Sequence, residues 1–136
     1  MSELIQPEGW PRPSGYANGV SASGRIISVA GQVGWNPLTA QFETDDLAEQ
    51  TAQALRNVVT VLRTAGAHPR NVVRLNWYVT DRAAYQSATK AIGRAYQQVF
   101  GPHYPAMTLV VVAGLLEPRA RVEIEATAVI PAPGSE

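Results

Sequence analysis

Two glutamates near the end of the chain have the residue type and spacing for proton-transfer chemistry. Glu123 and Glu125 alternate within the segment "RVEIEATAVI", so a strand there would place both carboxylates on one face. A partly desolvated carboxylate has a raised affinity for protons, so it can hold a water and accept and return a proton. The alternative is an exposed strand glutamate that pairs with Arg74 or Arg121. The residues alone favour this structural interpretation.

The other reactive side chains form no recognised motif. The two histidines, His68 and His103, have no acidic residues at ligand spacing, so no metal site is expected. The chain has no cysteine, which excludes thiolate ligands, thiolate nucleophiles and disulfides. Serines near the N-terminus have no histidine close in sequence and are typical turn formers. The segment "GVSASG" is too short for a phosphate loop, and no helix is predicted directly after it.

Length and charge narrow the classes of protein further. The chain has 136 residues, which predicts a single domain over 1–136 with a core that needs no covalent staples. Eleven basic and eleven acidic residues balance, which argues against a nucleic-acid partner. No apolar run approaches the roughly 20 residues of a membrane helix, and the first residues do not form a signal peptide. These features predict a cytoplasmic protein with no membrane partner.

Hydrophobic periodicity predicts the elements that must position these side chains. The segment 7–24, rich in proline, glycine and serine, is expected to form turns and irregular chain with at most short strands. Strands are predicted at 26–31, 71–81, 107–112 and 121–130, with helices from Asp45 or Asp46 to Gly66 and over 82–100. The apolar strand 107–112 is expected to be buried on both faces.

This order predicts a mixed sheet with two helices packed on one face, in the α+β class. The other face would carry Arg74, Glu123 and Glu125, together with one side of the apolar strand 107–112. Such a mixture is a poor solvent surface, and it is typical of an oligomer interface with polar sites set into it.

Five stretches, taken together, resemble the Rid family, the YjgF-like reactive-intermediate deaminases. They follow the order and approximate spacing of that family and cover most of the chain from Tyr16 onward. Each stretch alone is weak evidence, but the combination is specific. The stretches are "SVAGQVG" at 28–34, "QTAQALRNVVTVLRTAGA" at 50–67, "NVVRLNWYVTD" at 71–81, "YPAMTLVVVAGL" at 104–115 and "VEIEATAVI" at 122–130.

The resemblance implies a chorismate-mutase-like fold and a homotrimer, in which sheets pack into a central barrel with a cleft between each pair of subunits. It also implies cleft chemistry in which enamines and imines such as 2-aminoacrylate are hydrolysed to a keto acid and ammonia. No metal or organic cofactor takes part in that chemistry.

The same resemblance assigns roles to individual residues. Glu123 matches the family's cleft glutamate, which holds or activates the attacking water, whereas Glu125 lacks such a match and is interpreted as structural. Gly31 matches a glycine at the end of the "AGQ" strand that accepts the substrate. Tyr16 matches a cleft tyrosine, although it is equally interpretable as a loop anchor. Trp35 follows "AGQVG" and is a candidate for the cleft wall.

The step Pro105–Ala106–Met107 departs from the family pattern. Members that act on amino-acid-derived imines have arginine at the position of Met107, where it binds the substrate carboxylate in a bidentate pair. Loss of a charge-assisted contact worth about 1.5–3 kcal/mol would weaken carboxylate binding by roughly ten- to a hundredfold. Arg94 and His103 are candidates for a compensating cation. Ala106 and Met107 remain candidate substrate-binding residues.

The segment 82–100 is a second departure, because it is about one helical turn longer than in the arginine-bearing members. The family's cleft asparagine on this helix has no clear counterpart, and Thr89 is the nearest residue. Together with Met107, this predicts a larger or less polar cleft, and 2-aminomuconate-like enamines are a reasonable substrate class.

Three alternative functions stay open at the level of sequence. A non-catalytic trimer that binds a small metabolite is favoured by Met107, whereas Glu123 and Gly31 favour an enzyme. A ribonuclease or translation inhibitor is disfavoured by the neutral charge and the lack of a histidine pair. A chorismate mutase would need several cations for a dianionic substrate, and the missing arginine disfavours it.

Overall fold

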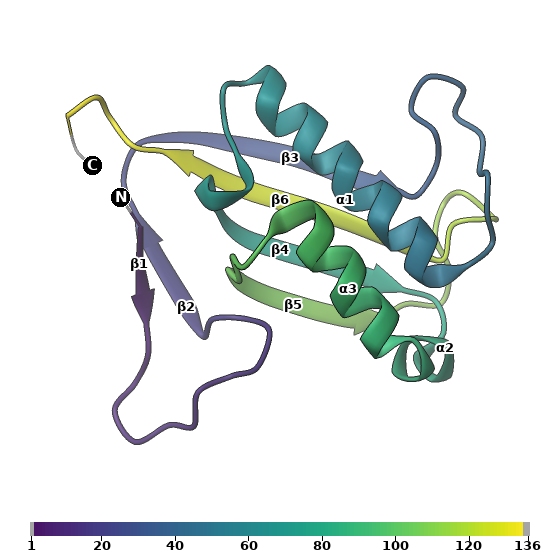
Figure 1. The fold of residues 1–136 in the computed structure, drawn as a ribbon, viewed down its shortest axis with the longest axis horizontal. Coiled ribbons are helices and arrows are strands. Elements are labelled where there is room, and N and C mark those ends of the chain that lie inside the picture. Colours follow the sequence, from purple (N-terminus) through teal and green to yellow (C-terminus); the bar gives the residue numbers. More distant parts are fainter. Residues whose placement is uncertain (1, 135–136) are drawn as a thin grey trace.

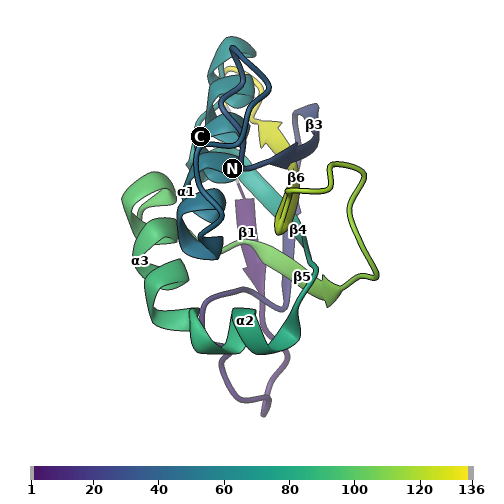
Figure 2. The same ribbon diagram turned by 90° about the vertical axis from the view of Figure 1, so that its right-hand side faces the viewer.

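The computed structural model describes residues 2–134 of the chain. Its centre is a four-stranded mixed sheet in the order β3–β6–β4–β5, in which only β4 and β5 are parallel neighbours. The strands are β3 (Arg25–Val33), β4 (Val72–Val79), β5 (Ala106–Val111) and β6 (Val122–Ile130). The helices that cover one face of this sheet are α1 (Leu47–Thr64), α2 (Arg82–Ser87) and α3 (Thr89–Phe100) (Figures 1 and 2). The predicted α+β class is confirmed.

Helix α1 begins and ends where its sequence signals predict. The side chain of Asp46 accepts a hydrogen bond from the N–H of Glu49 at 2.9 Å, and the acidic residues also favour the positive end of the helix dipole. Gly66 has φ +84°, a backbone conformation that ends the helix and that glycine adopts at low cost. The apolar residues between these ends share one face, which packs against β3 and β6.

The segment 82–100 forms two helices, so the prediction of one continuous helix is wrong. α2 is capped by the side chain of Asp81, which accepts from the N–H of Ala84 at 2.9 Å. At Ala88 the backbone has φ −106° and ψ 9°, which ends α2, and α3 starts at the next residue. The periodic apolar pattern does not reveal this break, because α2 and α3 both pack apolar residues against the core. α3 then packs beside α1.

Strand β5 lies at an edge of the sheet, and the prediction that it is buried on both faces is wrong. Val111, on the helix side at the end of the strand, is 44% exposed, and Val110 is 40% exposed because no layer formed by residues 2–134 covers the face opposite the helices. The same holds for Ile26 on the other edge strand, β3, which is 68% exposed. Apolar side chains remain on the open face at both edges of the sheet.

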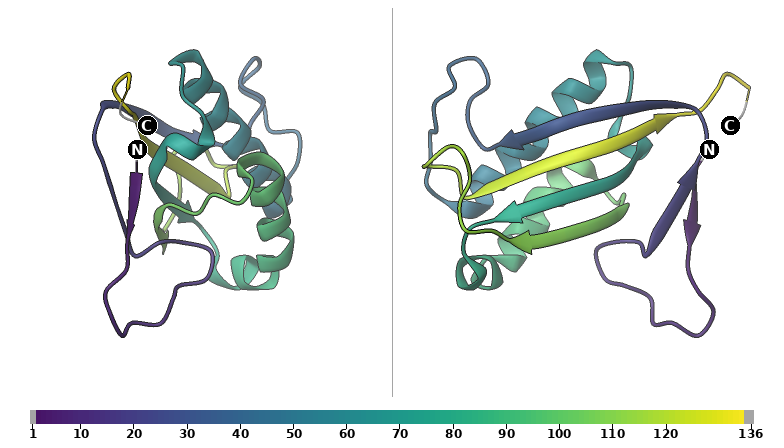
Figure 3. Two further views of the ribbon diagram at one scale, coloured as in Figure 1. Left: turned by 60° about the vertical axis from the view of Figure 1, so that its left-hand side comes forward. Right: turned by 180° about the vertical axis from the view of Figure 1, so that it is seen from behind.

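The N-terminal segment forms a hairpin of β1 (Ser2–Ile5) and β2 (Gly19–Ala22), which stands apart from the main sheet (Figure 3). β2 falls within the segment where at most short strands were expected, whereas β1 was not predicted. The connection between the two strands reaches the edge of the main sheet at one point. There Ala17 forms a bridge with Ala106, and its N–H donates to the carbonyl of Pro105 at 3.0 Å. This contact places Tyr16 beside the start of β5.

A buried glutamine ties α1 to the start of β6. Gln50 has no exposed surface, and its amide makes three hydrogen bonds outside the helix. Its Oε1 accepts from the N–H of Arg121 at 2.8 Å, and its Nε2 donates to the carbonyls of Thr44 at 3.0 Å and Arg119 at 3.1 Å. One buried side chain thereby satisfies three backbone groups, one from the segment before α1 and two from the segment before β6. We call this set of contacts the Gln50 clamp.

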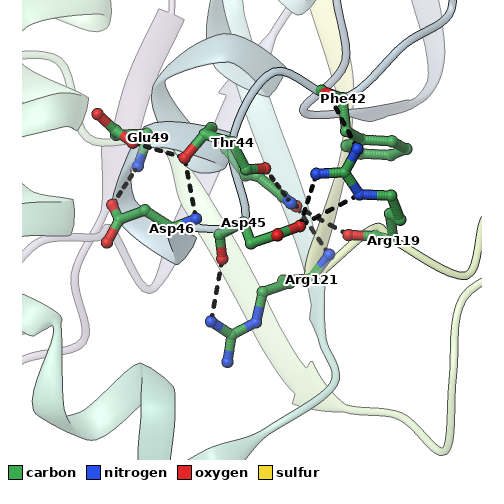
Figure 4. Close-up of polar contacts among 8 residues, drawn as sticks. Phe42, Thr44, Asp45, Asp46, Glu49, Arg119 and Arg121 are labelled. Atoms are coloured by element: carbon green, nitrogen blue, oxygen red, sulfur yellow. Dashed lines mark hydrogen bonds and ion pairs between the residues drawn. The ribbon is translucent and has the colours of Figure 1, made fainter.

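The surface around the Gln50 clamp adds an ion pair. Arg119 lies 2.8 Å from the carboxylate of Asp45, donates to the carbonyl of Phe42 at 3.0 Å and stacks over the Phe42 ring (Figure 4). Both partners of the ion pair are exposed, so we expect it to contribute at most about 1 kcal/mol. We therefore expect the hydrogen bonds of the buried Gln50 amide to stabilise the contact between α1 and the start of β6 more than this ion pair does.

Replacement of Gln50 by leucine should lower the free energy of unfolding by about 2–4 kcal/mol. Leucine has a similar volume, but it leaves one N–H and two carbonyls without partners. Each such group costs roughly 1–3 kcal/mol when fully buried, and these three are only partly buried, so the lower end of the range applies to each. Denaturant unfolding would measure the change, with the exposed Gln98→Leu on α3 as the control. A change below about 0.5 kcal/mol, the range of ordinary surface substitutions, would show that the clamp is not important.

Candidate functional site

Gly31 and Glu123 face each other on the open face of the sheet. β3 pairs with β6, and the register shifts between Val29 and Gln32, so Gly31 lies in a bulge. A Cβ atom at Gly31 would lie 2.1 Å from Oε2 of Glu123, far inside van der Waals contact. Only glycine leaves room for this carboxylate above the strand. The two residues that the sequence analysis placed at the centre of the cleft therefore lie together.

Glu123 and Glu125 share this face but have different surroundings. Glu125 accepts hydrogen bonds from the hydroxyl of Tyr78 and, at 3.3 Å, from the amide of Asn76. The hydrogen bond to Glu125 is the main reason that the pKa of Tyr78 is raised, so the phenol stays protonated and keeps donating. The interpretation of Glu125 as a structural residue agrees with these contacts.

Glu123 forms no side-chain hydrogen bond or ion pair with any residue between 2 and 134. The two arginines that were candidates for a structural pair are engaged elsewhere. Arg74 donates to the side chains of Asn76 and Thr108, and Arg121 donates to the carbonyl of Asp45 at 3.2 Å. The carboxylate of Glu123 is half-buried and available to a water or a ligand. Its interpretation as a surface ion-pair residue is therefore not supported.

A groove of about 900 Å³ lies on the other side of the sheet, between β5, α3 and the chain around Tyr16. We call it the α3 groove. Met107 and Leu109 of β5 and Trp77 of β4 contribute apolar surface, and Met107 also packs against the hydrophobic core. The aromatic rings that line the groove belong to Tyr16, Trp77, Tyr85, Tyr96 and Tyr104. Met107 and Tyr16, both predicted as substrate-binding residues, therefore line one groove.

Two tyrosines of the α3 groove, Tyr85 and Tyr96, are held uncharged at neutral pH. Burial, and to a lesser extent the neighbouring Tyr104, raises the pKa of Tyr96, whose hydroxyl donates to the carbonyl of His103. Burial likewise raises the pKa of Tyr85. No aspartate or glutamate lines the groove among residues 2–134. Its surface is therefore mainly apolar, and its only formal charges come from the basic residues of α3, Lys90 and Arg94.

The structure separates the two candidates for a compensating cation. Arg94 lines the α3 groove together with Met107, and so does Thr89. His103 does not, because its Nε2 lies 2.7 Å from the carbonyl oxygen of Val72 and the ring is held there. A cation is thus available near Met107, and it comes from the helix rather than from the strand.

Ala106 and Trp35, the remaining predicted site residues, have structural surroundings. Ala106 is the β5 residue that bridges to Ala17. Trp35 packs on the ring of Phe42 at a centroid distance of 5.8 Å, and its carbonyl accepts from the amide of Asn57 at 3.0 Å. Trp35 does not line the α3 groove.

Within one chain the predicted site residues form two groups on opposite faces of the sheet. Gly31 and Glu123 lie on the open face toward the β3 edge, whereas Tyr16 and Met107 lie on the helix side at the β5 edge. Side chains alternate between the two faces along a strand. Thr108 accepts a hydrogen bond from Arg74 on the open face, so Met107, the residue before it, lies on the helix side. A ligand cannot touch both groups of the same chain.

Some positioning residues have little signal in the sequence. Gln50 and Asn57 are buried polar residues in an otherwise amphipathic helix, and they hold the loops after β3 and before β6. Lys90, Arg94 and Gln97 recur at helical spacing, which is the signal in the sequence that places all three on one face of α3.

The described part of the chain contains no group of three or more histidine, cysteine, aspartate or glutamate side chains that could hold a metal ion. None of its helices is long and apolar enough to cross a membrane.

Comparisons with known proteins agree on one family. Residues 11–130 match the family described as endoribonuclease L-PSP. A RutC family protein of Pyrococcus horikoshii is 30% identical over 94% of this chain and 98% of its own, and the human 2-iminobutanoate/2-iminopropanoate deaminase is 32% identical over 77% and 73%. The crystal structure of a Rid family protein of unknown function from Yersinia pestis superposes with a TM-score of 0.83, at 36% identity, and covers 95% of this chain and 98% of its own. The fold is the chorismate-mutase-like fold of these proteins, and the chain belongs to the YjgF/Rid family.

Proposed function

We propose that the protein is a hydrolase that releases ammonia from a reactive enamine or imine. The observation that carries the proposal is the carboxylate of Glu123, which is half-buried, free of protein partners between residues 2 and 134, and seated over Gly31. A structural glutamate would be expected to have partners, as Glu125 has. The names of relatives such as the human 2-iminobutanoate/2-iminopropanoate deaminase support the same reaction class.

The reaction needs water, one proton shuttle and no redox partner. An enamine first tautomerises to an imine, and the oxygen of a water molecule then attacks the imine carbon while Glu123 takes a proton from that water. Glu123 returns the proton to the nitrogen, which gives a carbinolamine. It then takes the hydroxyl proton and delivers it to the amino group as the carbon–nitrogen bond breaks, so ammonia leaves and a carbonyl product remains. Gly31 gives the space in which substrate and carboxylate meet.

A second copy of the chain would complete the site. The two groups of site residues lie at opposite edges of the same sheet, so a head-to-tail contact between the β5 edge of one copy and the β3 edge of the next would bring them together. Head-to-tail contacts form a ring when the rotation between copies closes, and the homotrimer implied by the family resemblance would be such a ring. The exposed Ile26, Val110 and Val111 at these edges fit an interface. Tyr16, Ala106 and Met107 would then bind the substrate beside the neighbour's Glu123, with Trp35 as an outer wall.

The substrate would differ from those of arginine-bearing members. Met107 offers an apolar, polarisable surface and no charge, and the α3 groove beside it is within the size range of small-molecule sites. This combination supports substrates larger or less polar than 2-aminoacrylate, with 2-aminomuconate-like enamines as a class to examine.

Ammonia release from imines generated in situ tests the proposal. An amino-acid oxidase would supply imines from several amino acids, and a 2-aminomuconate-type enamine would be added separately. We expect the protein to accelerate ammonia release from at least one of them above the uncatalysed rate. Light scattering of the same sample should give the mass of three chains. If no substrate is accelerated, the protein is not this deaminase, and a non-catalytic trimer that binds a small metabolite becomes the better account.

A further inference from the structure

The groove wall formed by α3 carries two basic side chains that have no acidic partner among residues 2–134. Lys90 and Arg94 lie one turn apart and both line the α3 groove. No hydrogen bond or ion pair within residues 2–134 involves either side chain, and the groove lining contains no acidic residue there. α3 also starts at Thr89 without a side-chain cap, which leaves the positive end of its dipole at the same wall. The wall therefore favours an anion.

The opposite wall favours a flat apolar body. Tyr16 and Met107 line it with aromatic and thioether surface, and Tyr104, which stacks on Tyr96 of α3 at a centroid distance of 5.2 Å, adds a further ring to the groove. Aromatic faces and sulfur both contact planar unsaturated groups favourably. An occupant that satisfies both walls has a carboxylate at one end and a planar, conjugated body at the other.

Gly93 adds an independent observation. It lies in the interior of α3, between Lys90 and Arg94, where glycine destabilises a helix by roughly 0.5–1 kcal/mol relative to alanine. A Cβ atom there would meet nothing within 4 Å, so packing within the chain does not require glycine. Gly93 does line the α3 groove, and its missing side chain opens the helix backbone to whatever lies in the groove.

We infer that Lys90 and Arg94 bind the carboxylate of a substrate whose conjugated body lies along Tyr104 and Met107, with Gly93 giving the ligand access to the helix. This inference rests on the proposed function, since it specifies the substrate class for that site. The anion-binding cation is thereby moved from β5 to α3. Because α3 stands across the groove from Met107, the site selects acids with a long body over short ones.

Equilibrium binding of trans-cinnamate tests the inference without any turnover. Cinnamate has a carboxylate on a planar conjugated body, cinnamyl alcohol has the same body without the charge, and propanoate has the charge without the body. Titration calorimetry on the full chain should show binding of cinnamate and much weaker binding of the other two. The double variant Lys90→Gln/Arg94→Gln should weaken cinnamate binding by about three- to tenfold, as expected for exposed charged contacts. Arg70→Gln, an exposed arginine outside the groove, is the matched control and should change it less than twofold.

Gly93→Ala separates a ligand role from a structural one. It should raise the melting temperature, because alanine favours the helix, and at the same time weaken cinnamate binding. Equal binding of cinnamate to the wild type, the double variant and Gly93→Ala, or no binding to any of them, would overturn the inference. Ammonia release that persists alongside either result leaves the proposed function intact, whereas cinnamate binding without ammonia release removes the proposed function alone.

Discussion

Glu123→Gln is expected to lower kcat for ammonia release by about 10²- to 10⁴-fold, the usual contribution of a positioned general base. Glutamine keeps the shape of the side chain and can still hold a water, but it cannot accept a proton from that water at neutral pH. Glu123 has no protein partner between residues 2 and 134, so its replacement should leave the melting temperature within about 2 °C of the wild type. Initial rates with the best substrate and a thermal unfolding curve would measure both effects.

Two further variants make this experiment specific. Glu125→Gln is the matched control, because Glu125 lies on the same face but is held by Tyr78 and Asn76. It should reduce the rate far less than Glu123→Gln. Gly31→Ala should reproduce the loss of activity, since its Cβ atom would occupy the position of the Glu123 carboxylate and displace that flexible side chain. If Glu123→Gln kept more than a third of the wild-type rate, the proton-transfer role would have to be abandoned.

Met107→Arg is expected to raise kcat/KM for a short imino acid, such as 2-iminopropanoate, by about ten- to a hundredfold. A guanidinium at this position would bind the carboxylate in a charge-assisted pair worth about 1.5–3 kcal/mol, and each 1.4 kcal/mol corresponds to a factor of ten. The α3 groove has room for the longer side chain beside Tyr16 and Leu109. Steady-state rates over a range of imine concentrations would measure the change.

Met107→Leu is the control for this gain, because it preserves volume and apolar character and should leave short acids poor substrates. The arginine variant should also handle a long conjugated acid less well, since the charge displaces the apolar contact that its body makes. If Met107→Arg changed neither substrate, Met107 would lie outside the cleft of the assembled protein.

The sequence predicts the elements near the middle of the sheet better than those at its edges. Leu75, Trp77 and Val79 of β4 alternate with polar residues, and the structure buries all three against the helices. β5 gives an unbroken apolar run, from which periodicity alone predicts burial on both faces. The structure of a single chain leaves its open side exposed. An unbroken apolar run indicates that both faces of a strand are covered, but it does not say whether the covering layer belongs to the same chain or to another copy.

The residues of the candidate site come from the family resemblance, whereas their division between two edges of the sheet does not. The resemblance named Glu123, Gly31, Tyr16 and Met107, and period-two alternation gave the face of each strand residue. The separation toward opposite edges of the sheet depends on which strands are neighbours, and β6 inserts between β3 and β4 through pairings remote in sequence. The role of Arg94 was likewise undecided until α3 was placed over β5, because helical spacing does not say which strand a helix faces.

The Gln50 clamp joins segments that lie 69 residues apart in the chain, and two of the four strands of the main sheet, β4 and β5, lie between them. Closing so long a segment costs conformational entropy that a few hydrogen bonds cannot offset early in folding. The clamp should therefore form after the transition state, when β4 and β6 are already paired. In that case Gln50→Leu would leave the folding rate nearly unchanged and accelerate unfolding. The buried amide would then set the lifetime of the native state and not the rate at which the native state forms.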